Sequence, residues 1–164
     1  MQVLFLLEQV VNGLVLGGYY LLIALGLSLI FSVGGVVNLA HVAFYALGAY
    51  LSVTLARHLG FGWAAAVSPV AVGFLGILFE RFILRRFYTA DPILSLLVTF
   101  GLAMVAEQAI RMIWGAAPIP ASMPPVFKGS VLLGDFMLSK YRLFLLAVVA
   151  LVLAGMWFLL QRTS

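Results

Sequence analysis

The sequence predicts an all-α, polytopic membrane protein with about five transmembrane helices. Hydrophobic residues make up 65% of its 164 residues and charged residues only 9%, whereas a soluble domain is about 25% charged. The mean hydropathy is +1.22. Between Glu8 and Arg57 there is no Asp, Glu, Lys or Arg, so this stretch is suited to the interior of a bilayer. We expect residues 1–164 to form one transmembrane domain.

The charge-free stretch is about twice as long as one bilayer-spanning helix requires, and it predicts two spans. The first covers about residues 9–31 and the second about residues 37–56. In the first span, Gly13 and Gly17 are four residues apart, a spacing that permits close approach of another helix backbone. We expect these two glycines to serve general helix packing rather than a specific dimer motif.

Two further spans are predicted over about residues 63–84 and 92–114. Asp91 can cap free backbone N–H groups, and Pro92 suits the first position of a helix, so together they mark the start of the fourth span. Pro69 lies near the start of the third span, where a proline disturbs a helix less than at its centre. A fifth span covers about residues 141–160.

The longest break is the Pro-rich segment 115–140, which contains Pro118, Pro120, Pro124 and Pro125. These prolines exclude a continuous helix and predict an extramembrane loop, and apolar residues such as Val126 indicate an ordered one. Basic residues at the end of the third span predict that this end is cytoplasmic. They are Arg81, Arg85 and Arg86. Alternation then places the N-terminus and the Pro-rich segment outside.

A polar stripe within the second span is the main candidate for function. Asn38, His41, Tyr45, Gly48 and Ser52 follow one another at steps of three and four residues, so a helix places them on one face. Polar groups at membrane depth usually face a protein interior or a water-filled path. Asn38 and His41 can therefore line a substrate pathway with Tyr45, or satisfy backbone groups freed at the Gly34-Gly35 break. Gly48 is expected to be a helix-packing position.

The fourth span contains a second candidate, Glu107, four residues before Arg111. Acid before base at this spacing favours an ion pair on one helix face. The favoured interpretation is a structural pair near the helix end, with Arg111 extended toward the headgroups. The alternative is that Glu107 lies on the substrate pathway.

Several classes of function are disfavoured. The chain has no cysteine and no His or carboxylate cluster at metal-ligand spacing, and it contains no phosphate-binding loop or nucleophile motif. We therefore expect no catalytic residue, no bound metal, no cofactor and no enzymatic activity. The net charge of +4 fits cationic helix ends at the headgroups better than a nucleic-acid interface.

Three ordered blocks of sequence resemble the LivH-type permease subunits of branched-chain amino acid ABC importers. They are NGLVLGGYYLLIALGLSLIFSVGGVVNLAHVAFYALGAYLS at 12–52, ERFILRRF at 80–87, and DPILSLLVTFGLAMVAEQAIRMIWG at 91–115. The resemblance implies a permease in a bacterial-type inner membrane. It also implies four kinds of partner: a second permease, two cytoplasmic ATPases, an extracytoplasmic substrate-binding protein, and the lipid bilayer.

Two departures from the family pattern lead to further expectations. The family has Gly after the Asn-Leu-Ala-His run, whereas this chain has Val42, which is expected to crowd a close helix contact. Family permeases are also nearly twice as long, so the chain is expected to be an N-terminal portion of the importer permease fold. Two alternatives remain open: a permease for urea or short amides, and a truncated membrane protein that does not transport.

Overall fold

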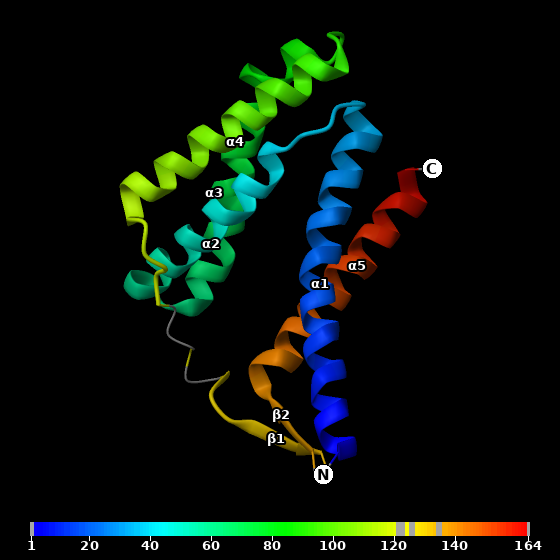
Figure 1. Cartoon of the computed structure of the whole chain (residues 1–164), viewed down its shortest axis with the longest axis vertical. Coiled ribbons are helices and arrows are strands. Elements are labelled where there is room, and N and C mark those ends of the chain that lie inside the picture. The colour runs from blue at the N-terminus through cyan, green and yellow to red at the C-terminus, as the bar shows by residue number, and fades with distance from the viewer. Residues whose placement is uncertain (1, 121–123, 125–126, 134–135, 164) are drawn as a thin grey trace. The chain divides into compact units, whose positions relative to one another are not determined.

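A computed structural model describes residues 2–120, 124, 127–133 and 136–163 (Figure 1). A long helix lies at each of the five predicted spans, which confirms the helical fold class. The helices and strands in chain order are α1 (Gln2–Gly34), α2 (Ala40–Leu59), α3 (Phe61–Phe82), the short 3-10 helix η1 (Leu84–Phe87), α4 (Pro92–Trp114), β1 (Ser130–Leu133), β2 (Phe136–Ser139) and α5 (Lys140–Thr163).

The five long helices differ in how apolar they are. Within the described part of the chain, four segments are long and apolar enough to cross a membrane: Leu6–Ser32, Phe61–Phe87, Pro92–Trp114 and Lys140–Arg162. The helix α2 has 20 residues but is not among them, because His41, Tyr45 and Arg57 lower its apolar content. It packs against α3 and α4, so protein contacts cover surface that a lone span would expose to lipid.

The start of α4 follows the predicted signals. Asp91 Oδ1 accepts a hydrogen bond of 2.9 Å from the backbone N–H of Ile93, and Pro92 is the first helical residue. This cap satisfies one of the N–H groups that a helix start leaves without a partner. Pro69 lies inside α3.

The Pro-rich segment differs from the expected loop, because it contains an antiparallel hairpin. Strands β1 and β2 pair from Ser130 with Ser139 to Leu133 with Phe136. The backbone N–H of Lys140 donates to Gly129 O at 3.2 Å beside the hairpin. Val, Leu and Phe within the two strands favour an extended backbone. Pro125 and Val126 lie outside the described residues.

The chain divides into two compact units, and each is described here by itself. One unit comprises residues Met1–Leu25 and Ser122–Ser164. In it, Gly18 of α1 lies against Val149 of α5, since a Cβ at Gly18 would be 3.0 Å from Val149 Cγ2. Both residues are buried, so the absence of a side chain at Gly18 permits this helix contact.

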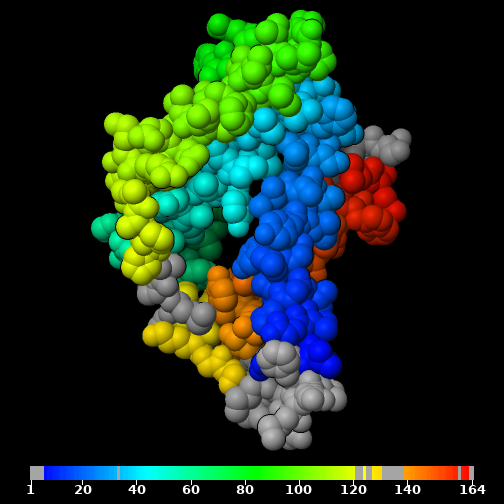
Figure 2. Space-filling model, viewed as in Figure 1, coloured from blue at the N-terminus to red at the C-terminus, as the bar shows by residue number. Residues whose placement is uncertain are grey.

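The second unit, Gly26–Ala121, contains the end of α1 together with α2, α3, η1 and α4. Helices α2 and α3 are joined only by Gly60, whose φ of +82° suits glycine at a sharp turn. A buried cluster formed by Val36, Ala40, Phe79 and Leu84 is the centre of this unit. Figure 2 shows α4, in green, lying along α2, in cyan.

Candidate functional site

The connection between α1 and α2 is a backbone break that polar side chains stabilise. The chain leaves α1 through Gly35, at a φ of +64°. Asn38 is only 5% exposed, and its Oδ1 accepts a hydrogen bond of 3.0 Å from the backbone N–H of Ala40. The N-cap residue of α2 is Leu39, so this contact is an Asx turn that satisfies the first backbone N–H of the helix. The Asn38 amide nitrogen has no hydrogen-bond partner among the described residues.

Thr99 of α4 forms hydrogen bonds with the backbone of the same break. Its hydroxyl oxygen accepts from the Leu39 N–H at 3.3 Å and lies 3.2 Å from Val37 O, to which it can donate. The single hydroxyl proton can alternatively go to Ser95 O or Leu96 O within α4, at 3.0 and 3.1 Å. Thr99 is fully buried, so these contacts replace water for backbone groups outside any helix.

Ser95, one turn before Thr99, makes a related contact. Its hydroxyl donates to Phe87 O at 3.1 Å, at the end of η1. Sequence reasoning did not single out Ser95 or Thr99. The detectable signal was two hydroxyl residues at i and i+4 in an otherwise apolar helix.

His41 packs against a glycine of α1. A Cβ at Gly26 would lie 2.7 Å from His41 Cε1 and closer still to Nε2. Real Cβ atoms are essentially never found at such distances, so an alanine at Gly26 would require the imidazole to move. The position of the His41 ring therefore depends on Gly26.

Beside this contact lies a cavity of about 650 Å³, which we call the hinge cavity. Its polar lining consists of Asn38, His41, Glu80 and Tyr88, and its apolar lining includes Phe44. The Tyr88 hydroxyl donates to Glu80 Oε1 at 3.0 Å. Burial, and then the hydrogen bond and negative charge of Glu80, raise the pKa of Tyr88 above its usual value, so this hydroxyl remains a donor.

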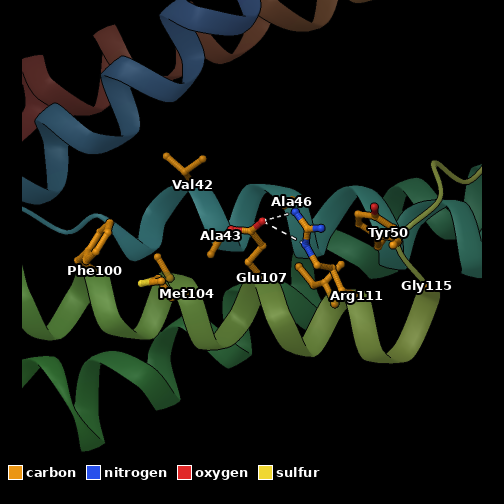
Figure 3. Close-up of a pocket in the computed structure, with 12 residues that line it drawn as sticks. Val42, Ala43, Ala46, Tyr50, Phe100, Met104, Glu107, Arg111 and Gly115 are labelled. Atoms are coloured by element: carbon orange, nitrogen blue, oxygen red, sulfur yellow. Dashed lines mark hydrogen bonds and ion pairs between the residues drawn. The ribbon is translucent and has the colours of Figure 1, made fainter.

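A second hollow of about 450 Å³ lies between α2 and α4, and we call it the α2–α4 cavity. Glu107 and Arg111 extend into it from α4 (Figure 3). Arg111 donates from both Nη2, at 2.7 Å, and Nε, at 3.2 Å, to the same oxygen, Glu107 Oε1. Both side chains are more than half exposed, at 64% for Glu107 and 55% for Arg111.

A hydrogen bond also joins α2 to α4 beyond this cavity. Trp114 Nε1 donates to Thr54 Oγ1 at 2.8 Å, and the Thr54 hydroxyl lies 2.8 Å from Tyr50 O. The rings of Tyr50 and Trp114 are 5.5 Å apart between centroids. At the same end, Arg57 Nη2 donates to Pro120 O at 3.3 Å. Polar contacts thus join α2 and α4 at both ends of the α2–α4 cavity.

The predicted pathway residues do not all come together. Asn38 and His41 line the hinge cavity, while Glu107 lines the α2–α4 cavity. Tyr45 is 51% exposed and lines neither of the two. The pathway roles of all four residues stay predictions.

The three glycines predicted to serve packing have different surroundings. A Cβ at Gly48 would lie 3.6 Å from Val72 Cγ2 of α3, an ordinary contact distance. A Cβ at Gly13 or Gly17 would meet nothing within 4 Å. Their packing role stays a prediction.

The expected crowding at Val42 was wrong. Val42 is 51% exposed and lines the α2–α4 cavity. In Figure 3 its isopropyl group extends from α2 on the side away from the α4 ribbon. A β-branched residue is tolerated for that reason.

Within the described residues, no three His, Cys, Asp or Glu side chains are grouped in a way that could hold a metal ion.

Comparison with known proteins shows the family to which the chain belongs. The family described as "Branched-chain amino acid transport system / permease component" matches residues 9–164. The high-affinity branched-chain amino acid transport system permease protein LivH of Salmonella typhimurium is 27% identical over 144 residues. That alignment covers 82% of this chain and 46% of the relative.

A second relative gives the same result. The permease protein BraD of Pseudomonas aeruginosa, also of a high-affinity branched-chain amino acid transport system, is 25% identical over 170 residues. The alignment covers 96% of this chain and 55% of BraD. The chain thus spans about half the length of these curated relatives. No solved structure matches it.

Proposed function

The chain belongs to the family of permease components of branched-chain amino acid transport systems, and on that premise we propose that it forms part of the permease of an ABC importer. Its substrates are branched-chain amino acids or close relatives. It is a multi-pass membrane protein, and we place it in the inner membrane because its relatives are bacterial. The permease itself carries out no covalent chemistry.

The observation that supports this proposal best is the break between helices α1 and α2, where side chains form hydrogen bonds with the free backbone groups. Irregular backbone at membrane depth is tolerated where protein buries it or where it lines a water-filled cavity. Here Asn38 and Thr99 satisfy the freed backbone groups, and Asn38 and His41 line the hinge cavity. Transporters often place their substrate sites beside helices broken in this way.

The lining of the hinge cavity suits a passing amphipathic solute. Asn38, Tyr88 and Glu80 offer hydrogen-bonding groups, while Phe44 and Phe79 offer an apolar wall. Sites for small molecules combine these features, with few polar groups in a mostly apolar wall. A cavity of about 650 Å³ is large enough for an amino acid.

An ABC importer also contains subunits other than this permease chain. No phosphate-binding loop is present in the sequence, so two cytoplasmic ATPases would bind and hydrolyse ATP. A substrate-binding protein would deliver the amino acid on the extracytoplasmic side. A second permease would cover part of the apolar surface, for example around Val105 and Met112, which are 65% and 79% exposed.

Uptake by cells tests this proposal. We expect deletion of the gene for this chain to abolish high-affinity uptake of labelled leucine, isoleucine and valine, and the gene supplied in trans to restore it. Loss of urea uptake with unchanged leucine uptake would instead support an amide permease. No change in either uptake would contradict a transport function.

A further inference from the structure

The α2–α4 cavity has a charged half and an apolar half, and both lie on one face of α4. Phe100, Met104, Glu107 and Arg111 follow one another at steps of four, three and four residues. This spacing places them in one row along the helix. The row is therefore apolar at one end and carries both a negative and a positive charge at the other.

The ion pair leaves hydrogen-bonding capacity toward the cavity. Both contacts from Arg111 go to Glu107 Oε1. Among the residues that the structure describes, neither Glu107 Oε2 nor Arg111 Nη1 has a hydrogen-bond partner. A carboxylate accepts and a guanidinium donates further bonds in such an arrangement. One site thus offers an acceptor for an ammonium group beside a donor for a carboxylate.

The opposite wall, on α2, leaves room for a ligand at these charges. Ala43 and Ala46 face the ion pair with the smallest side chains that carry a Cβ (Figure 3). Val42, Phe100 and Met104 line the apolar half, and each is at least half exposed. Met104 and Glu107 are about 4.5 Å apart along the helix axis, at about 1.5 Å per residue, within the length of a leucine side chain.

The exposed ion pair gives the α2–α4 cavity a polar end. Charged side chains facing lipid are costly, and they usually line a water-filled path or contact a polar partner. We propose that the α2–α4 cavity binds a zwitterionic, branched aliphatic amino acid, with its carboxylate on Arg111, its ammonium on Glu107 and its side chain against Val42, Phe100 and Met104. This inference rests on the proposed transport function, and it assigns the recognition of both charged groups to one place.

Binding of three ligands to the full chain in lipid nanodiscs tests the assignment. Leucine carries both charged groups, 3-methylbutylamine lacks only the carboxylate, and 4-methylpentanoate lacks only the ammonium. We expect each analogue to bind about tenfold more weakly than leucine, the usual order for losing one charge-assisted hydrogen bond. Equal affinity for all three, or no saturable leucine binding, would overturn the proposal.

Two variants test which ligand group each charged side chain binds. Arg111→Gln should weaken leucine binding about tenfold but should not weaken the binding of 3-methylbutylamine, since that amine has no carboxylate to lose. Glu107→Gln should weaken leucine binding about tenfold but should not weaken the binding of 4-methylpentanoate, which has no ammonium group to lose. A merely structural pair would instead change all three affinities alike, or none. Arg111→Lys, which keeps the charge without the planar fork, should have an intermediate effect.

Matched controls separate this site from general effects on charge and folding. Arg81→Gln removes an exposed arginine outside the α2–α4 cavity and should change none of the affinities. Val42→Ala should weaken leucine severalfold while leaving the binding of alanine unchanged, because only the longer side chain reaches Val42. Loss of leucine affinity in Arg81→Gln would contradict a local site.

The complete transporter separates failure of this inference from failure of the proposed function. If the wild-type chain supports leucine uptake and both Glu107→Gln and Arg111→Gln retain its KM, the binding assignment is wrong and the transport function stands. If the wild-type chain binds leucine with the expected selectivity but supports no uptake, the transport function is wrong and the binding site stands.

Discussion

Trp114 on α4 donates a hydrogen bond of 2.8 Å from Nε1 to Thr54 Oγ1 on α2. At the other end of the same helix pair, Thr99 accepts a hydrogen bond from the N–H of Leu39. The two contacts connect positions about 60 residues apart in sequence and lie on either side of the α2–α4 cavity.

Replacing Trp114 by Phe tests the contact at the Thr54 end. The variant keeps an aromatic ring near Tyr50 but loses the indole N–H, so we expect a loss of about 1 kcal/mol in stability. The measurement is thermal unfolding in detergent, where the midpoint should fall by a few degrees. Trp157→Phe, at a ring that is 64% exposed on α5, is the control. An equal fall in both variants would contradict a specific role for the Trp114 contact.

Replacing Thr99 by Val tests the contact at the break. The valine has nearly the same shape but leaves the Leu39 N–H without its acceptor, at a cost of about 1–3 kcal/mol for a buried group. Hydrogen exchange at the Leu39 amide should become faster, whereas Thr99→Ser should retain the protection. Unchanged exchange in Thr99→Val would show that another group satisfies this N–H.

Gly26→Ala should disrupt the α1–α2 contact. The added methyl group collides with the His41 ring, and overpacking of this kind costs about 1–3 kcal/mol. The measurement is again the unfolding midpoint in detergent. His41→Ala in the same chain should restore much of the loss, because it removes the colliding ring.

Gly17→Ala is the matched control for Gly26→Ala. A Cβ there would meet nothing within 4 Å, so the better helix propensity of alanine should leave stability unchanged or raise it by up to about 1 kcal/mol. Equal destabilisation at Gly17 and Gly26 would contradict the contact with His41.

Asn38 has a structural role and a predicted pathway role, and two substitutions separate them. Asn38→Leu leaves the buried Ala40 N–H without its acceptor and should cost about 1–3 kcal/mol. Asn38→Ser keeps a side-chain oxygen acceptor but removes the amide N–H groups, so stability should be largely retained while leucine uptake falls. Unchanged uptake in a normally assembled Asn38→Ser transporter would mean that the amide does not line the pathway.

Breaking the Glu107–Arg111 pair should affect stability much less than ligand binding. The pair is exposed, and exposed i,i+4 pairs contribute about 0.3–0.5 kcal/mol. We therefore expect the unfolding midpoint of Glu107→Gln to lie within about two degrees of the wild type. A large fall in the unfolding midpoint would indicate that the pair mainly stabilises α4.

The sequence predicted the long helices well because their signals are local. Hydropathy gave the five segments, and the Asp91-Pro92 pair marked the start of α4 at the residue where the helix begins. The β1–β2 hairpin was not predicted, because its strands have four residues each and follow a cluster of prolines. Short strands of this length are specified by their pairing as much as by their own sequence.

The candidate site was predicted less completely, because its contacts join distant parts of the chain. The glycine pair at the break indicated that Asn38 could satisfy backbone groups, and its Oδ1 does so. The contribution of Thr99, on another helix, could not be read from local spacing. The spacing of polar residues in α2 also did not predict which neighbouring side chain would line the hinge cavity. Phe44 lines it, and Tyr45 does not.

ATP-dependent uptake of labelled leucine into proteoliposomes tests the central claim most directly. The vesicles would contain this chain with a second permease, two ATPases and a substrate-binding protein. We predict accumulation that requires ATP and the binding protein and that unlabelled isoleucine and valine suppress. Accumulation that is the same with and without this chain, or none in a fully assembled complex, would contradict the account.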